Sequence, residues 1–291
     1  MARFELTDEE YELLKPHLPA ERPNRKGRPW MPHRQILNGI FWVLRTGAPW
    51  RDMPERYGKW QTVYDRFSRW RREGLIQHLL QILVDNARCR DLLDFDFGAM
   101  DGTVVRAHKA ASGARKKNGD KTLTPEESRV AQGLGVSRGG LSTKIHLATD
   151  GNGLPLSFTI TPGQTHEATQ VDALLDGISI GGKRGRRRRR LRVIGGDKGY
   201  HGRDIRERIK KRGIKALIPQ RKDRNGEYSE PDRPFDKVLY RRRNVVERRN
   251  GHLKENRRIA TRYEKLGVNF IAMIQLAFVL TFLKILLSDR A

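Results

Sequence analysis

The apolar residues of the first ninety positions recur at helical spacing. Three stripes are present: Ile36, Ile40, Leu44; Trp60, Val63, Tyr64, Phe67; and Ile76, Leu79, Leu80, Leu83. Gly47 and Gly74 follow the first two stripes and predict helix ends there. Thr7 and Glu10 have the spacing of a capping box, which predicts a further short helix at the N-terminus. These patterns predict a small all-helical region.

The second stripe has a polar front opposite its aromatic back. The side chains of that front that we expect to contact DNA are Gln61, Thr62, Arg66 and Arg69. Such a helix is typical of a helix-turn-helix-like DNA reader. Amphipathic helices also occur in any small helical bundle, so the pattern alone leaves both interpretations open.

From about Phe95 the pattern becomes that of short strands alternating with helices. Strands are expected at 95–108, 140–150 and 154–163, the last two joined by a "DGNG" turn typical of a hairpin. The remaining order is a helix at 166–178, a strand within 189–200 that includes Val193 and Ile194, a helix at 202–213, a strand at 214–219, and helices at 237–258 and 267–283. Antiparallel strands followed by alternating units predict a mixed sheet with helices on its faces. We therefore divide the chain into a helical domain, 1–92, and an α/β domain, 93–291.

Two polar segments interrupt this pattern. The Gly-rich stretch 109–138 is expected to be a loop, and so is the arginine run within 181–190. The arginines of that run (186–190) could contact phosphates, but they match no motif.

The charge balance favours nucleic acid as a partner. The chain has 59 Lys and Arg against 34 Asp and Glu, a net charge of +25, and a pI near 10.7. A polyanion would neutralise this excess, and DNA is a better candidate than an anionic membrane surface. This charge favours the DNA-reading interpretation of the helical domain.

Other features indicate a cytoplasmic protein without a membrane anchor. Cys89 is the only cysteine, which excludes an internal disulfide and a multi-cysteine zinc site. The N-terminus lacks the apolar core of a signal peptide. The uncharged stretch 267–283 falls short of the ~20 residues of a membrane span, so we expect it to be a buried core helix.

Two aspartates follow predicted strands. Asp101 comes after the apolar "FDFGAM", and Asp197 comes soon after Val193 and Ile194. Ligand sites of open sheets lie near the carboxyl ends of strands. A single aspartate in such a turn is more often a turn former, but two of them favour a shared site.

A glutamate stands among arginines in "YRRRNVVERRNGHLKE". At about 100° per residue, Tyr240, Arg243, Glu247 and Lys254 fall within a stripe roughly 60° wide. An apolar stripe, Leu239, Val246 and Leu253, lies beside it and would dock the helix with Glu247 at the edge of a cleft. The simpler alternative is that Glu247 pairs with a neighbouring arginine, which is worth about 0.2–1 kcal/mol at an exposed site.

Three converging carboxylates repel one another unless cations lie between them. Oxygen ligands suit Mg²⁺, and two ions about 3.5–4 Å apart can hold the attacking and leaving oxygens of a phosphoryl transfer. We expect Asp101, Asp197 and Glu247 to bind two Mg²⁺, with Mn²⁺ able to substitute. Arg243 and Lys254 would then hold phosphates, and Tyr240 would contact a base or a phosphate.

The element order and several motifs resemble DDE transposases of bacterial insertion sequences, which have a ribonuclease H-like fold. The spacing of Tyr240, Arg243, Glu247 and Lys254 matches their Y-R-E-K signature, and "AMDGTVVRAH", "DKGYHG" and "GAPWRDMPERYGKW" are similar to the same proteins. The resemblance covers nearly the whole chain and favours the insertion-sequence family five group. It implies that Asp101, Asp197 and Glu247 are the metal-binding catalytic triad. It also implies cleavage that frees 3′-hydroxyls at transposon ends, followed by strand transfer into target DNA.

Two other functions remain open. One is a catalytically inactive, repressor-like relic that only binds DNA, and the other is a nuclease that cuts without joining. The resemblance further implies a homodimer or larger assembly on double-stranded DNA, associated with the nucleoid of a bacterial cytoplasm.

Overall fold

The computed structural model describes residues 4–21, 30–112, 125–137, 139–180, 191–220 and 235–288. The N-terminal helices are α1 (Asp8–Leu14), α2 (His33–Thr46), α3 (Trp60–Arg72) and α4 (Leu75–Cys89), with 3-10 turns at Lys15–His17, Trp50–Asp52 and Glu55–Tyr57. Thr7 and Glu10 bond each other's backbone N–H, which confirms the capping box. Gly47 ends α2 with φ 72°, a conformation that glycine adopts without strain.

The described residues then form a seven-stranded sheet. Its strands are β1 (Phe97–Ala107), β2 (Gly135–Ser137), β3 (Gly140–Asp150), β4 (Pro155–Pro162), β5 (Val193–Gly195), β6 (Lys215–Leu217) and β7 (Thr261–Arg262). The order is β2-β3-β1-β5-β6, with β4 also beside β3 and β7 beside β1. The strand β3 is antiparallel to β1 and β4, whereas β5 is parallel to β1 and β6. This is the mixed, ribonuclease H-like sheet expected from the sequence, and the "DGNG" hairpin joins β3 to β4 as predicted.

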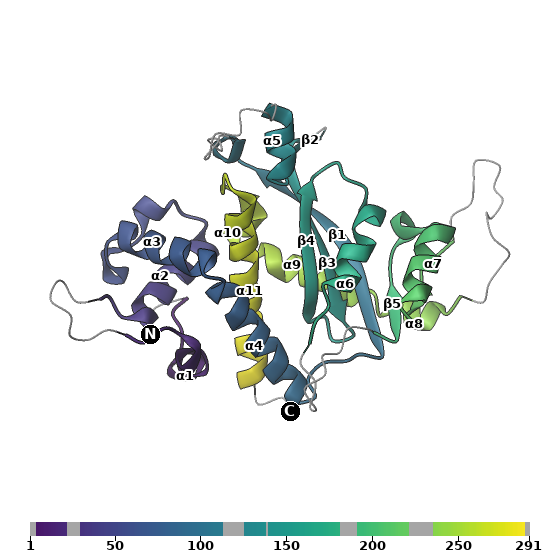
Figure 1. Cartoon of the computed structure of the whole chain (residues 1–291), viewed down its shortest axis with the longest axis horizontal. Helices are drawn as coiled ribbons and strands as arrows, with labels where there is room; N and C mark the ends of the chain where they lie inside the picture. The colour runs from purple at the N-terminus through teal and green to yellow at the C-terminus, as the bar shows by residue number, and fades with distance from the viewer. Residues whose placement is uncertain are drawn as a thin grey trace.

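Helices flank the sheet (Figure 1). They are α5 (Pro125–Ala131), α6 (Val171–Asp176), α7 (Arg203–Lys211), α8 (Lys237–Arg241), α9 (Asn244–Lys254), α10 (Arg257–Ala260) and α11 (Gly267–Leu287), with 3-10 turns at Lys109–Ser112, Glu167–Gln170 and Lys198–Tyr200. Helix α7 lies toward the β5 side in Figure 1, α6 packs against β3 and β4, and α9 lies between α11 and the sheet.

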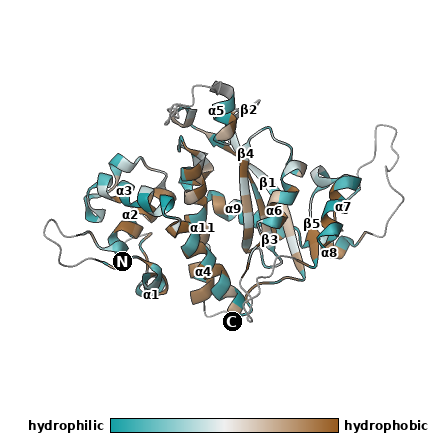
Figure 2. Cartoon of the chain, in the orientation of Figure 1, coloured by the Kyte–Doolittle hydropathy of each residue, from teal (hydrophilic) through white to brown (hydrophobic). Residues whose placement is uncertain are grey.

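The apolar helix α11 is a core helix, as predicted. It is long and apolar enough to cross a membrane, but 67% of its most apolar window is buried within the protein. It packs along α4, between the N-terminal helices and the sheet (Figure 1), and the ribbon of its apolar residues is brown in Figure 2. One apolar core therefore includes residues of both predicted domains. The boundary between residues 92 and 93 stays a prediction.

Two expectations about elements are wrong. The described part of 109–138 is not a plain loop, because it contains α5 and β2. The expected single helix at 237–258 is divided into α8, α9 and α10. Between α8 and α9 the backbone bonds tighten to the i to i−3 type, and Arg242 reaches back to Asp94 at 2.5 Å. The arginine run at 186–190 lies outside the described residues.

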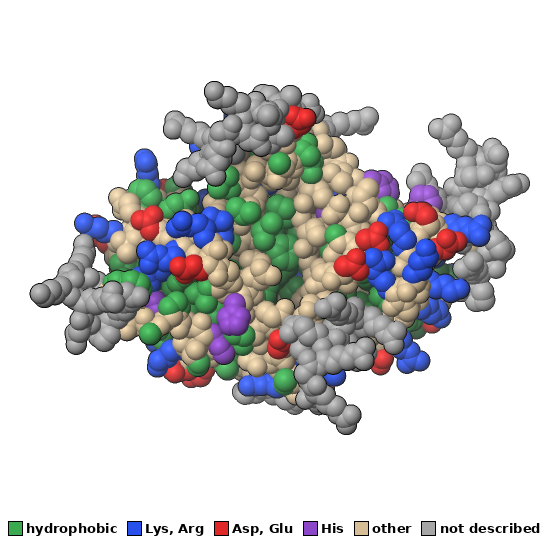
Figure 3. Space-filling model, in the orientation of Figure 1, with side chains coloured by type: hydrophobic (Ala, Val, Ile, Leu, Met, Phe, Trp, Pro, Cys, Tyr) green, Lys and Arg blue, Asp and Glu red, His purple; other side chains and the backbone are tan. Residues whose placement is uncertain are grey.

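Some of the positive charge is balanced within the protein. Over α6 and α7, basic and acidic side chains alternate on the surface (Figure 3). Arg208 pairs with Asp172 at 2.5 Å, and Arg212 pairs with Asp176 at 2.8 Å. These ion pairs join α6 to α7, so this surface is less attractive to DNA than the total charge suggests.

Candidate active site

Asp101 and Asp197 lie side by side at one level of the sheet. The parallel pairing of β1 and β5 ends where Ala99 faces Gly195. Asp101 follows two residues later within β1, and Asp197 follows two residues later, just beyond the end of β5. Asp197 is at a strand end, as expected. The expectation for Asp101 is wrong, because β1 continues to Ala107 through its pairing with β3. The shared position arises because β5 is short.

Asp101 is a largely buried carboxylate. Its Oδ2 accepts a hydrogen bond of 3.0 Å from Nδ2 of Asn250, and Nη1 of Arg243 lies 3.6 Å from Oδ1. Burial raises the pKa of Asp101 to about 6; Arg243 lowers it, and the charge of Glu167 raises it further. The ionised carboxylate is therefore destabilised in spite of its two partners, so a cation at this position would be favourable.

Asp197 is held by the turn that follows it. Its side chain caps the 3-10 turn Lys198–Tyr200, with Oδ1 accepting from the Gly199 N–H at 2.8 Å. The second carboxylate oxygen takes no part in this cap. Asp197 thus has a fixed orientation next to Asp101.

Glu247 projects from the first turn of α9 and is half-exposed. Nη2 of Arg243 donates a hydrogen bond to its Oε1. This is the simpler pairing that the sequence left open. Within the described ranges, no three side chains of the His, Cys, Asp and Glu types are gathered closely enough to hold a metal ion. Glu247 is linked to Asp101 through the guanidinium of Arg243.

The other members of the predicted stripe are only partly brought together. Tyr240 stacks beneath Arg243, whose guanidinium carbon lies 5.8 Å from the ring centroid. The ring of Tyr240 also packs against Phe235, with centroids 5.0 Å apart. Lys254 ends α9, two turns beyond Glu247 and roughly 10 Å along the axis. Tyr240 and Arg243 therefore adjoin Glu247, and Lys254 lies farther along the same helix.

Three residues near the aspartates were missed by the sequence analysis. Asn250, 5% exposed, could have been found, because it follows Glu247 by three residues and falls on the same helix face. Glu167, in the turn Glu167–Gln170, and Tyr200, after Asp197, carried no such signal. Their positions depend on tertiary packing.

The predicted DNA contacts of α3 differ in exposure. Gln61, Thr62 and Arg69 are exposed. Arg66 is buried: its Nη1 lies 3.0 Å from Nδ1 of His33, and its guanidinium stacks on the ring of Trp30. Arg66 thus packs within the helical region, which argues against the predicted DNA contact.

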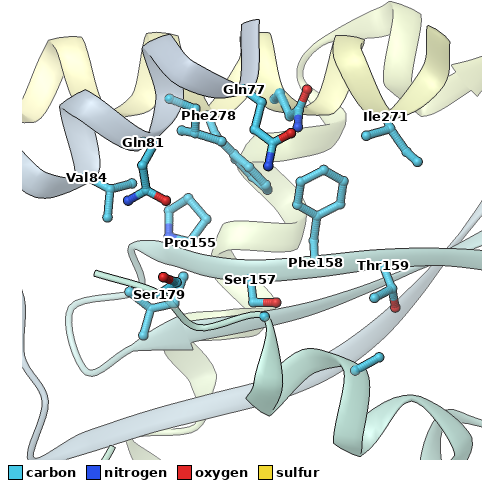
Figure 4. A pocket seen from close by; sticks show the side chains of 15 residues that line it. Gln77, Gln81, Val84, Pro155, Ser157, Phe158, Thr159, Ser179, Ile271 and Phe278 are labelled. Atoms are coloured by element: carbon cyan, nitrogen blue, oxygen red, sulfur yellow. The ribbon is translucent and has the colours of Figure 1, made fainter. Parts of the chain in front are cut away.

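A separate pocket lies between α4, α11 and β4. Figure 4 shows Gln77 and Gln81 of α4, Ser157 and Phe158 of β4, and Phe278 of α11 around it. All of the residues that line it are uncharged. The pocket contains none of the predicted site residues, and its lining cannot supply acid–base or metal chemistry.

Sequence comparison relates the chain to known transposases. Residues 6–80 match the family model described as "Putative transposase of IS4/5 family", and residues 93–282 match "Transposase DDE domain". An "uncharacterized protein y4sN" of Sinorhizobium fredii is 33% identical to this chain, and the matched region covers 40% of this chain and 87% of that protein. An uncharacterized 16.2 kDa protein of insertion element IS402 from Burkholderia cepacia is 35% identical to this chain. That match covers 37% of this chain and 76% of the other protein.

Two further similarities are partial. A "Putative transposase for insertion sequence element IS402" from Burkholderia cepacia is 34% identical over 42% of this chain, which spans about half (54%) of that protein. A solved Mos1 transposase paired-end complex with the left transposon end matches at 14% identity, over 78% of this chain and 80% of the other. Its TM-score is only 0.25, so the assignment rests on the family models. The DDE model covers well over half of the sequence, and the chain belongs to the transposase family that carries this domain.

Proposed function

We propose that the protein is a DNA transposase that binds the ends of its own insertion sequence, hydrolyses a phosphodiester bond there and joins the freed ends to target DNA. In the first step water attacks phosphorus and the 3′-oxygen leaves with a proton. In the second step that 3′-hydroxyl attacks a target phosphodiester, forming a new bond and releasing the target's own 3′-hydroxyl. The Y-R-E-K spacing supports placement in the family five group.

The observation that carries this proposal is the adjacency of Asp101 and Asp197. Two carboxylates beside each other, one of them buried with a raised pKa, need positive charge nearby. Titratable groups with strongly perturbed pKa values cluster at functional sites. Membership in the DDE transposase family gives this pair its proposed chemistry.

The carboxylates of the predicted site are chemically suited to bind divalent cations. Asp101, Asp197 and Glu247 offer hard oxygen ligands of the kind that Mg²⁺ and Mn²⁺ prefer. Arg243, which contacts both Asp101 and Glu247, lies where positive charge is favourable between them. When bound, two such ions would neutralise the carboxylates and polarise the phosphate for attack.

The chain's own side chains would position the DNA. Arg243 and Lys254 are suited to phosphate oxygens, and Tyr240 offers a half-buried ring beside Arg243. For Arg243 to bind a phosphate it has to release Glu247, which frees that carboxylate for a cation. DNA entry and assembly of the triad would then occur together.

The N-terminal helices would recognise the DNA. Gln61, Thr62 and Arg69 present exposed polar groups on one helix, and the net charge of +25 favours phosphate binding. Since two ends have to be joined, a homodimer or larger assembly on DNA is expected. This function places the protein in the bacterial cytoplasm, at the nucleoid.

A strand-transfer assay tests the proposal. The full chain is incubated with Mg²⁺ or Mn²⁺, a pre-cut element end with a free 3′-hydroxyl, and a target duplex. A joined product that EDTA prevents supports a transposase. Cleavage without joining would identify a nuclease instead, and DNA binding without either reaction would identify a relic.

A further inference from the structure

Glu167 lies against the backbone beside both aspartates. A methyl group added at Gly102, the residue after Asp101, would lie 2.6 Å from Oε1 of Glu167. One added at Gly199, two residues after Asp197, would lie 3.4 Å from Oε2. The two oxygens of this carboxylate thus approach the two aspartate-bearing segments, one oxygen to each. A side chain at Gly102 would disturb this approach, whereas one at Gly199 would make ordinary contact with Glu167.

The three carboxylates influence one another electrostatically. Burial raises the pKa of Glu167, Lys144 lowers it and Asp197 raises it. Glu167 in turn raises the pKa of Asp101 more than Asp197 does. Lys144 lies 3.6 Å from Oε1 of Glu167 and also donates to the Thr165 carbonyl at 2.8 Å. The pKa of Glu167 remains raised because the effect of burial outweighs that of Lys144.

Tyr200 provides an independent sign of an incomplete polar site. Its side chain is fully buried, and its hydroxyl has no hydrogen-bond partner among the described residues. Burial raises the pKa of Tyr200, and the charges of Glu167, Asp101 and Asp197 raise it further, so the hydroxyl is within electrostatic reach of these carboxylates. An unpaired buried hydroxyl is costly unless a bound ligand or water satisfies it. Its placement indicates that something polar belongs among the three acids.

We propose that Glu167 is a fourth carboxylate of the active site, holding a divalent cation together with Asp101 and Asp197. This inference rests on the proposed function and extends its ligand set by one residue. Glu247 is bound to Arg243 on α9, whereas the two oxygens of Glu167 approach the two aspartate-bearing segments. The three carboxylates are not gathered closely enough to hold an ion in this structure, so they would have to close around the cation. Tyr200 would orient one of these carboxylates through its hydroxyl once the cation draws them together.

Calorimetric titration of the full chain with Mn²⁺, without DNA, tests this inference. The variants are Glu167→Gln and a control, Glu207→Gln, which removes an exposed glutamate paired with Arg203 on α7. We expect Glu167→Gln to weaken Mn²⁺ binding at least ~10-fold and the control to leave it within ~2-fold. Without metal, Glu167→Gln should melt no lower than the wild type, because it removes a charge that burial destabilises.

The outcomes separate the two proposals. Wild-type affinity in Glu167→Gln, together with a loss of binding in Glu247→Gln, overturns the role of Glu167 and leaves the triad intact. A wild type that binds no Mn²⁺ overturns the cation site itself. If Glu167→Gln does not fold, Glu167→Asp is titrated in its place: its shorter side chain withdraws from Gly102 and Gly199, so unchanged affinity contradicts the proposal.

Discussion

Asn250 joins the helix of Glu247 to the central strand of the sheet, because its Nδ2 donates a 3.0 Å hydrogen bond to Oδ2 of Asp101. The two residues are 149 positions apart in the chain. Asn250 is 5% exposed and its Oδ1 has no partner in the described part of the chain, so its amide serves Asp101 alone. This bond fixes the distance between β1 and α9 at the site.

Replacing Asn250 by alanine should therefore slow DNA cleavage. Hydrogen bonds to charged groups contribute about 1.5–3 kcal/mol, which corresponds to roughly a 10- to 100-fold loss in the nicking rate. Affinity for the DNA ends should be unchanged, because Asn250 is buried. The comparison variant is Asn269→Ala on α11, away from the site, for which we expect a normal rate. Equal rates in the two variants would contradict the positioning role.

The pKa of Asp101 predicts how stability depends on pH without metal. Its value of about 6 lies above the ordinary 3.8, so the folded protein binds more protons than the unfolded chain between these pH values. The contribution of this group to the free energy of unfolding therefore falls as pH rises through that window, by at most roughly 2–3 kcal/mol. The Asp101→Asn variant should lack this part of the fall in the free energy of unfolding.

Urea unfolding at pH 4 and pH 7.5 in EDTA measures this difference. The wild type should lose more stability between the two pH values than Asp101→Asn does. Asp150, whose pKa burial raises to about 7, contributes to the decline in both proteins and cancels in the comparison. An identical decline in the two proteins would show that Asp101 is not destabilised when ionised.

Alanine substitutions at two glycines of the site region should change the stability of the protein in opposite directions. A methyl group at Gly102 would lie 2.6 Å from Glu167, so Gly102→Ala displaces that carboxylate and should lower both stability and Mn²⁺-dependent nicking. Gly251 lies in α9 with open space around it, so Gly251→Ala should stabilise the protein by up to about 1 kcal/mol. Thermal unfolding and nicking assays on both variants check these opposite signs; stabilisation by Gly102→Ala would contradict them.

Two arginines of α3 should have separable effects. Arg66 is enclosed by His33 and Trp30, so Arg66→Ala should lower the melting temperature. Arg69 is exposed, so Arg69→Ala should leave the melting temperature unchanged and weaken binding to the element's ends. The slope of the logarithm of the binding constant against the logarithm of the salt concentration should become shallower by about one unit. Binding measured at several salt concentrations gives the slope. An unchanged slope for Arg69→Ala would exclude it as a phosphate contact.

The sequence predicted what local patterns encode. The "DGNG" hairpin, the Thr7 capping box and the Gly47 helix end depend on a few neighbouring residues, and all three are confirmed. The position of Asp197 just beyond a strand end was also predicted, whereas Asp101 lies within β1.

Features that depend on distant residues were not predicted. The division of the 237–258 helix involves Arg242 turning toward Asp94, which is 148 residues away. Arg66 was expected on a DNA-contacting face, but Trp30 and His33 from outside α3 cover it. Glu167 reaches the site only through the folding of β4 against β3, and no spacing in the sequence indicates this.

The most direct test of the central claim is metal-dependent nicking of DNA that carries the element's own ends. Wild type and Glu247→Gln are compared in Mg²⁺, Mn²⁺ and EDTA, with DNA binding measured in parallel. The proposed function predicts that the wild type nicks only with metal, and that Glu247→Gln binds the DNA equally well without cutting it. Equal nicking by both proteins, or nicking by the wild type in EDTA, would contradict it.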